Sequence, residues 1–198
     1  MSDKVKKALR SLYDDIDYRR DGFYKENVEA LMKNAAKNKL KKAIYSAAFL
    51  DEGSREDLYN WWKMHTKQDL LPNVPKHSHM TIKFKPSEEE VLALPIGESS
   101  EQKVTVIGLA YDEFGQAVQV KVNDDSFARQ DDGIAHITIS TAKDVPPVYS
   151  NELLARGVEE VKVGPELSVK VGLFLNNQKI SYDLDGTIYA DEEITVDV

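Results

Sequence analysis

Two short segments of the chain place a histidine and a threonine two residues apart: His79 and Thr81, and, 57 residues later, His136 and Thr138. Around both pairs, polar and apolar residues alternate with a period of two, which is typical of a β-strand with one buried face. Residues i and i+2 point to the same side of a strand. Each histidine therefore shares a face with its threonine, and two such strands together would present two imidazoles and two hydroxyls.

These groups are the ones that cleavage of a phosphodiester requires. A histidine titrates near pH ~6.5, so a neutral one can take a proton from the nucleophile while a charged one gives a proton to the leaving oxygen. The threonine hydroxyls can donate hydrogen bonds to the non-bridging phosphate oxygens. A 2′-hydroxyl or a water beside a ribose as the nucleophile would make the substrate RNA-like. No His, Asp or Glu cluster has metal-ligand spacing, so we expect no metal and no cofactor.

Five further residues are candidates for contacts with the substrate. Tyr45 lies on a predicted strand beside the site and can stack on a base, with packing in the core as the alternative. Lys83 and Ser140 continue the period of two beyond the threonines, and are expected on the same faces. Lys83 can meet phosphate or remain a solvated lysine. Tyr149 and Asn151 follow the second pair and can border the pocket, with a plain turn and helix cap as the alternative.

The elements that must position these residues alternate along the chain. Helical spacing of apolar residues predicts two helices within residues 1–42. The later patterns first predict strand 43–50, a helix capped at Ser54 and reaching about His65, and the first His-x-Thr strand. A short helix capped by Ser87 and a hairpin of 103–111 and 116–122 follow. The second His-x-Thr strand then leads to a short helix capped by Ser150 and ending at Gly157, and to strands within 158–198.

Each His-x-Thr strand thus lies in a comparable context of strands and helices. This order predicts an α+β fold of two lobes related by a pseudo-twofold. The two histidines are expected on facing strands of a concave antiparallel sheet, which forms the substrate groove. The N-terminal helices would extend this body.

Charge is divided unevenly along the 198 residues. Residues 1–42 hold 12 Lys and Arg against 7 Asp and Glu, a net charge of +5, and residues 43–198 hold 14 against 27, a net charge of −13. The helical pattern predicts an N-terminal extension, 1–42, whose helices pack on a domain, 43–198. So acidic a domain disfavours long nucleic acid, whose phosphates supply most of the affinity, but it permits a small anionic substrate. The basic extension is expected to be a solvated helical face, or alternatively an arm for an anionic partner.

The composition also bounds the compartment. There is no cysteine, which excludes disulfides, thiolate metal sites and a cysteine nucleophile. No apolar run approaches the roughly 20 residues of a membrane helix, and the charged N-terminal segment shows no signal peptide. We therefore expect a cytoplasmic protein with no membrane contact and no evident stable protein partner.

Together, the two His-x-Thr segments resemble the paired motifs of the two-histidine (2H) phosphoesterase superfamily. Strand 43–50, the helix after it and the segment 147–151 resemble its RNA-ligase cyclic-phosphodiesterase and RNA-repair-like branch, and the resemblance extends over about residues 43–175. It implies a bilobal α+β fold and metal-free hydrolysis of 2′,3′-cyclic ends, 2′-5′ or 3′-5′ linkages, or cyclic nucleotides. Some phage and viral relatives degrade cyclic nucleotide immune signals, so the resemblance also includes an anti-defence (anti-CBASS) enzyme.

Two other interpretations of the same residues remain. The groove can hold a nucleotide or an RNA end without turnover, with the histidines as hydrogen-bond donors. Alternatively, residues 1–42 act as an interaction arm and the rest of the chain as a scaffold. The presence of both histidines and both threonines favours a catalytic site over either of these.

Overall fold

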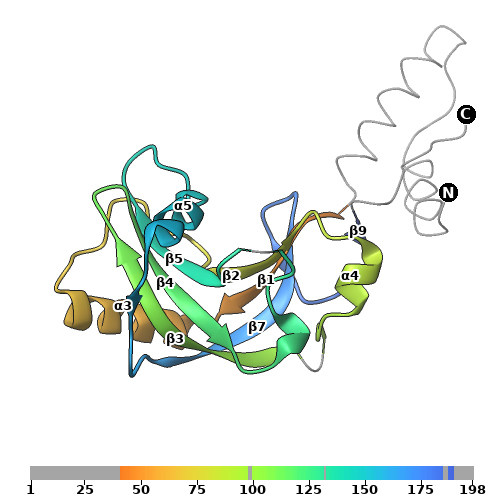
Figure 1. The fold of residues 1–198 in the computed structure, drawn as a ribbon. Helices are drawn as coiled ribbons and strands as arrows, with labels where there is room; N and C mark the ends of the chain where they lie inside the picture. The colour runs from red at the N-terminus through yellow and green to blue at the C-terminus, as the bar shows by residue number, and fades with distance from the viewer. Residues whose placement is uncertain (1–40, 98–99, 132, 185–186, 190–198) are drawn as a thin grey trace, which may run out of the picture.

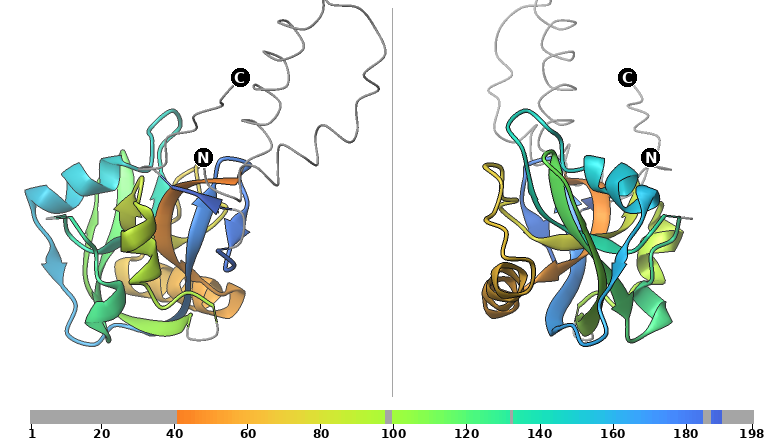
Figure 2. Two further views of the ribbon diagram at one scale, coloured as in Figure 1. Left: turned by 90° about the vertical axis from the view of Figure 1, so that its right-hand side faces the viewer. Right: turned by 60° about the vertical axis from the view of Figure 1, so that its left-hand side comes forward.

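The computed structural model describes residues 41–97, 100–131, 133–184 and 187–189 (Figures 1 and 2). The two helices predicted within 1–42 fall on residues outside these ranges. Lys41 and Lys42, the last two residues of that segment, belong to the first strand. The elements in chain order are β1 (Lys41–Leu50), α3 (Glu52–Thr66), β2 (His79–Phe84), α4 (Glu88–Leu92), β3 (Glu101–Tyr111), β4 (Gly115–Val122), the 3-10 helix η2 (Asp125–Phe127), β5 (His136–Thr141), α5 (Tyr149–Arg156), β6 (Glu159–Glu160), β7 (Glu166–Leu175), β8 (Ile180–Ser181) and β9 (Thr187–Ile188).

Six of the strands form a closed antiparallel barrel in the order β3-β4-β5-β2-β1-β7, and pairing of β7 with β3 closes the ring. The closing contact joins Glu101–Thr105 of β3 to Glu166–Lys170 of β7. Short strands extend the edges: β6 pairs with β3, β8 pairs with β7, and β9 runs parallel to β1. The seam between β2 and β5 is the narrowest, since it consists of the single pair Met80 and Ile137.

The expected bilobal α+β fold with an open concave groove is therefore wrong. In the described part of the chain, the strands hold about twice as many residues as the three α-helices, which have 15, 5 and 8 residues. The pairing of β3 with β7 brings together residues 61 to 69 positions apart and turns the sheet into a barrel. Alternation along a strand shows which face is buried, but it does not show whether a sheet closes on itself.

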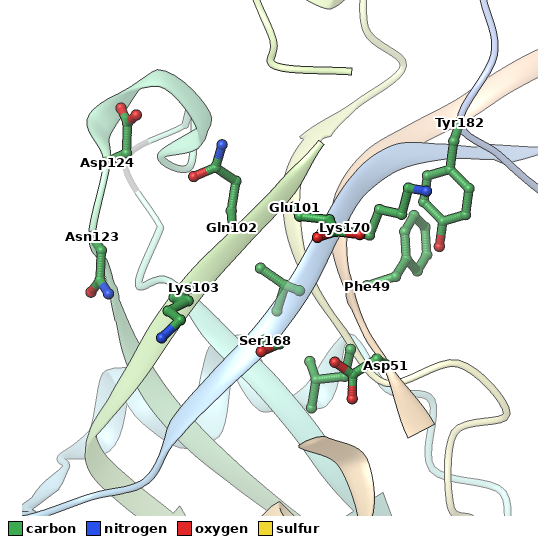
Figure 3. Close-up of a pocket in the computed structure, with 12 residues that line it drawn as sticks. Phe49, Asp51, Glu101, Gln102, Lys103, Asn123, Asp124, Ser168, Lys170 and Tyr182 are labelled. Atoms are coloured by element: carbon green, nitrogen blue, oxygen red, sulfur yellow. The ribbon is translucent and has the colours of Figure 1, made fainter. Parts of the chain in front are cut away.

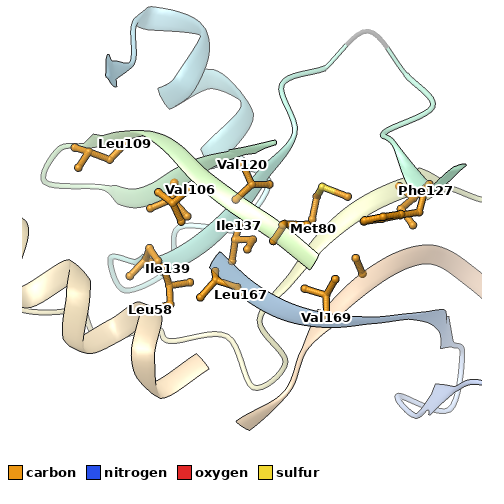
Figure 4. Packing of buried hydrophobic residues seen from close by; sticks show 14 of the residues in the cluster. Leu58, Met80, Val106, Leu109, Val120, Phe127, Ile137, Ile139, Leu167 and Val169 are labelled. Carbon is orange, nitrogen blue, oxygen red and sulfur yellow. The ribbon is translucent and has the colours of Figure 1, made fainter. Parts of the chain in front are cut away.

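Apolar side chains from all six strands fill the barrel interior (Figure 4). Leu58 and Trp62 of α3 are fully buried in the same cluster, so α3 covers one end of the barrel. On the outer side, Leu153 and Leu154 of α5 pack on β3 and β4 through Ala110 and Ala117. The interior residues contributed by the strands are Ala48, Met80, Ile82, Val104, Val106, Leu109, Val118, Val120, Ile137, Ile139, Leu167, Val169 and Val171.

Strand β2 contains a register shift immediately after Thr81. In its pairing with β1, Ala47 lies opposite Thr81, but the next residue, Ser46, lies opposite Lys83, so Ile82 is an extra residue. A β-bulge of this kind leaves one residue unpaired and reverses the alternation of faces beyond it.

Strand β5 contains the equivalent register shift immediately after Thr138. In its pairing with β4, Ala117 lies opposite Thr138 and Gln116 lies opposite Ser140, so Ile139 is the extra residue. Both His-x-Thr strands thus lose the period of two at the same position, one residue after the threonine.

The helix caps only partly follow the sequence prediction. Helix α3 begins earlier than expected: the Asp51 side chain caps it by accepting a hydrogen bond from the Ser54 backbone N–H at 2.7 Å, so the prediction of Ser54 as the cap is wrong. The predicted Ser87 cap of α4 is confirmed, with Glu90 completing a capping box. Ser150 does not cap α5 but lies buried within its first turn. Every helix in the described ranges is too short or too polar to span a lipid bilayer.

Candidate active site

An open cavity of about 370 Å³ lies on the outer face of the barrel, over the seam between β2 and β5. It brings together the histidine and the threonine of both motifs. Two of the five other candidates, Tyr45 and Asn151, also line it, whereas Lys83, Ser140 and Tyr149 do not. The lining residues are Tyr45, Pro75, His77, His79, Thr81, Phe84, Arg129, Asp131, His136, Thr138, Pro147, Val148 and Asn151.

The pair Met80 and Ile137 sets the relation between the two motifs. Its antiparallel register places His79 across from Thr138 and His136 across from Thr81, while Met80 and Ile137 point into the core. The two histidines are therefore diagonal neighbours, which on an antiparallel pair lie roughly 7–8 Å apart. The local twofold of the site comes from strand pairing rather than from two lobes, and two imidazoles at this spacing can reach one phosphate.

Both imidazoles are held by the same backbone contact. The Nδ1 atom of His79 lies 2.8 Å from the carbonyl oxygen of His77, and Nδ1 of His136 lies 2.7 Å from the carbonyl oxygen of Ile134. A carbonyl oxygen only accepts hydrogen bonds, so in each ring Nδ1 carries the proton and donates it. The Nε2 atoms are thereby left for proton transfer.

His79 lies against aromatic rings. It stacks on Tyr45 with 5.0 Å between ring centroids, and its centroid lies 5.5 Å from that of Phe49. Burial among these rings lowers the pKa of His79, with smaller contributions from the neighbouring His136 and His77, although the backbone hydrogen bond opposes the shift. The site thus favours the neutral form of His79.

His136 has charged neighbours instead. Arg129 Nη1 lies 3.1 Å from its Nδ1, and Arg129 in turn forms an ion pair with Asp131. Burial is the main cause that lowers the pKa of His136. Arg129 lowers it further, whereas the hydrogen bond to the Ile134 carbonyl and the Asp131 carboxylate raise it.

Tyr45 occupies the middle of a stack of three rings. Its centroid lies 5.0 Å from that of His79 on β2 and 4.9 Å from that of Phe174 on β7, at interplanar angles of 19° and 12°. Because β1 lies between β2 and β7, both faces of the Tyr45 ring are covered. Burial also raises the pKa of its hydroxyl to about 12. This geometry favours the packing alternative, in which Tyr45 supports His79 rather than stacking on a base.

The two threonine hydroxyls differ in their partners. Thr138 Oγ1 lies 2.9 Å from Ser150 Oγ on α5. The Thr81 hydroxyl lines the cavity, and no residue in the described ranges forms a hydrogen bond with it. Both threonines line the cavity together with the two histidines.

The register shifts explain why Lys83 and Ser140 lie outside the cavity. Lys83 turns towards α4 and pairs with Glu90 at 3.0 Å. Ser140 is fully buried: its hydroxyl donates to Gln116 Oε1 at 2.6 Å and accepts from the backbone N–H of Leu71 at 2.9 Å. Ser140 thereby fixes the segment that leads into β2.

Tyr149 also has a structural position. Its hydroxyl donates a hydrogen bond of 2.6 Å to Asp112 in the β3–β4 turn, and its ring contacts Phe114 edge to face. These contacts hold the turn against α5, away from the cavity. Asn151, by contrast, lines the cavity and donates from Nδ2 to the Val148 carbonyl at 3.0 Å.

Among the polar and aromatic residues that line the cavity, Phe84, Arg129 and Asp131 were not identified from the sequence pattern, and the pattern left the orientation of His77 open. A strict period of two would place Phe84 on the buried face with Met80 and Ile82, but the bulge at Ile82 turns it outwards, and 58% of it is exposed. Arg129 and Asp131 lie in an irregular loop, where periodicity carries no information. The only available signal was their position shortly before His136.

A larger cavity, of about 710 Å³, lies elsewhere on the barrel, beside the ends of β1, β3, β4 and β7 (Figure 3). Its lining mixes both signs of charge, for example Glu101 beside Lys103 and Lys170, and includes no histidine. Phe49 contacts both regions, since it lines this cavity and packs on His79. The smaller cavity, which both motif histidines line, is therefore the candidate site for acid–base chemistry. Throughout the described ranges, no three His, Asp or Glu side chains are grouped as metal ligands.

This chain was compared with known families and solved structures. A sequence model of the fungal tRNA ligase phosphodiesterase domain matches residues 52–178. A solved structure described as a fungal RNA kinase is similar with a TM-score of 0.46 and 12% identity, over 84% of this chain and 56% of that chain. This chain thus spans little more than half the length of that structure. Among curated proteins, no sequence matches.

Paired His-x-Thr strands that meet over one cavity are typical of a phosphodiesterase of the two-histidine class. The match to residues 52–178 covers well over half of the 198 residues. The chain belongs to the family of fungal tRNA ligase phosphodiesterase domains, and the predicted membership of the RNA-repair branch of the 2H phosphoesterases is confirmed.

Proposed function

We propose that this protein hydrolyses a 2′,3′-cyclic phosphate at the end of an RNA without a metal ion. The observation that carries the proposal is the pair of Nδ1-protonated imidazoles, diagonal across one antiparallel seam, with a threonine hydroxyl beside each. One Nε2 takes a proton from the attacking water as the new oxygen–phosphorus bond forms. The other Nε2 gives a proton to the ribose oxygen as its bond to phosphorus breaks.

Two features support an RNA end as the substrate. The family is named for a tRNA ligase phosphodiesterase, and an RNA end with a cyclic phosphate presents one strained diester to a cavity open to solvent. Residues 43–198 carry a net charge of −13, which disfavours binding of an extended phosphate backbone. Small cyclic oligonucleotides are the second substrate class, and their turnover would make this protein an enzyme that removes cyclic nucleotide signals.

A substrate panel in excess EDTA tests the reaction. We expect the full chain to open a nucleoside 2′,3′-cyclic phosphate and a short oligonucleotide with a cyclic end, with no loss of rate on chelation. Cyclic di- and trinucleotides form the second arm, measured by chromatography of the products. Activity that disappears with EDTA and returns with Mn²⁺ or Zn²⁺ would contradict metal-free acid–base chemistry. Tight binding of these ligands with no turnover would instead identify a binding module.

Phe84 provides an exposed aromatic ring at the rim of the cavity, with Lys85 Nζ 5.5 Å from the ring centroid. Stacking of a base on such a ring contributes about 1–3 kcal/mol, so Phe84→Ala should raise KM by roughly 5- to 150-fold with a smaller change in kcat. Phe84→Tyr keeps the ring face and should retain the parental KM. Phe114→Ala removes a similarly exposed ring (46% against 58%) outside the cavity and is the matched control. An unchanged KM in Phe84→Ala would remove Phe84 from the substrate site.

A further inference from the structure

The loop between β4 and β5 is built around the guanidinium of Arg129. The Nε and Nη2 atoms of Arg129 donate to the two carboxylate oxygens of Asp131, and Nη1 of Arg129 donates to the Ile134 carbonyl at 2.9 Å. The side chain is only 12% exposed although it lines the cavity. All three nitrogens of the guanidinium therefore have protein partners, which fix Arg129 in place.

The backbone around Arg129 is arranged to fit this contact. A Cβ on Gly133 would lie 2.5 Å from Arg129 Cζ, so the guanidinium packs on a position where a side chain would collide with it. The Gly133 backbone N–H donates to Asp131 Oδ1 at 3.0 Å, and the Gln130 backbone N–H donates to the Ile82 carbonyl at 2.9 Å. The second bond ties the loop to β2, the strand that carries His79.

The Ile134 carbonyl accepts from Arg129 and from His136 at the same time, at 2.9 Å and 2.7 Å. The carbonyl that fixes the His136 ring is thus itself fixed by Arg129. The corresponding carbonyl for His79 belongs to His77, and no arginine or carboxylate is bonded to it in the described part of the chain. The two histidines share the backbone contact but differ in the charged groups behind it.

We propose, on the basis of the function proposed above, that the Arg129–Asp131 pair is a positioning device that holds the His136 ring through the Ile134 carbonyl, with His136 as the proton donor of the reaction and His79 as the proton acceptor. An aromatic surrounding disfavours an imidazolium, and this is the environment of His79. The Asp131 carboxylate raises the pKa of His136, whereas the Arg129 guanidinium beside Nδ1 lowers it. Arg129 places that carboxylate and limits its effect.

The proton inventory of this assignment is complete. Nε2 of His79 takes the proton of the attacking water, the ribose oxygen leaves with the Nε2 proton of His136, and solvent exchange restores both rings. The charged and titratable groups that face His136 come from two elements: Arg129 and Asp131 from its own loop, and His79 from β2, with Lys83 of β2 acting on Asp131. On the other side, β4 places the uncharged Gln119 opposite His136.

Substitution of the two charges in turn gives shifts of opposite sign. Asp131→Asn removes the charge that raises the pKa of His136, so this pKa should fall, and the basic limb of the kcat/KM–pH profile should move to lower pH. Arg129→Gln leaves the Asp131 carboxylate uncompensated. The pKa of His136 should therefore rise, and the basic limb of the profile should move to higher pH. Arg129→Gln combined with Asp131→Asn should return the limb towards the parental position. NMR titration of the His136 ring, with His65 on α3 as the control resonance, reads the same shifts directly.

The outcomes separate a positioning role from a structural one. Rates that fall equally at every pH, with an unmoved His136 titration in folded variants, would overturn the proposal. Movement of the acidic limb instead of the basic limb would make His136 the proton acceptor and overturn the assignment of roles. The NMR titration needs no turnover, so inactivity on every phosphodiester, which would end the proposed function, is distinguishable from an unmoved His136.

Discussion

His79→Ala and His136→Ala should each lower kcat/KM on a 2′,3′-cyclic phosphate by about 10²–10⁴-fold. Each substitution removes one of two imidazoles that act in the same proton-transfer cycle. The Nδ1 atoms of both imidazoles already bind backbone carbonyls, so each ring has only Nε2 for proton transfer. Residues that act as a unit are strongly non-additive. The double variant should therefore be little slower than the slower single variant.

His65→Ala is the matched control for this pair. His65 lies on α3, where its ring stacks on Trp61 with 4.7 Å between centroids, and it does not line the cavity. The substitution His65→Ala should therefore leave kcat/KM unchanged. Full activity in either His79→Ala or His136→Ala would show that the reaction occurs elsewhere or needs only one imidazole.

Thr81→Val should lower kcat by about 10²–10³-fold if its hydroxyl acts as an oxyanion donor. Valine keeps the shape of threonine and removes only the hydroxyl, which has no hydrogen-bond partner among the described residues. The free energy of unfolding should therefore change little. A stopped-flow or chromatographic rate assay, together with thermal unfolding, measures both quantities.

Thr138→Val tests the second hydroxyl, with a structural cost that Thr81→Val lacks. It removes the partner of the buried Ser150 hydroxyl, and an unsatisfied buried hydroxyl costs about 1–3 kcal/mol of stability. Ser150→Ala separates the two effects, because it breaks the same hydrogen bond but keeps the Thr138 hydroxyl in the cavity. A kcat loss in Ser150→Ala as large as that in Thr138→Val would return Thr138 to a purely structural role.

The local patterns of the sequence were sufficient for the strands that carry the chemistry. Alternation around His79 and His136 predicts two strands, and both are present as β2 and β5. The turn at Asp112 and the end of α5 at Gly157 also follow from residues close in sequence. These features depend on backbone preferences and on the burial of one face, which a short stretch of residues determines.

Features that depend on distant segments were not predictable in this way. The β3–β7 pairing that closes the barrel leaves no mark in either strand's alternation. The bulges at Ile82 and Ile139 are set by pairing with β1 and β4, so a strict period of two misplaced Lys83 and Ser140. The covering of Tyr45 by rings from two other strands could not be read from its own segment.

The matching bulges at Ile82 and Ile139 also limit how the His-x-Thr pair can be transferred to another protein. On a regular strand, the residue two positions after the threonine, Lys83 or Ser140, would lie on the same face as the threonine. Here the strand turns its next residues away directly after the hydroxyl, which leaves Phe84 at the edge of one copy and buries Ser140 in the other. A designer who grafts these two motifs onto an unrelated sheet must therefore transplant the extra residue along with them.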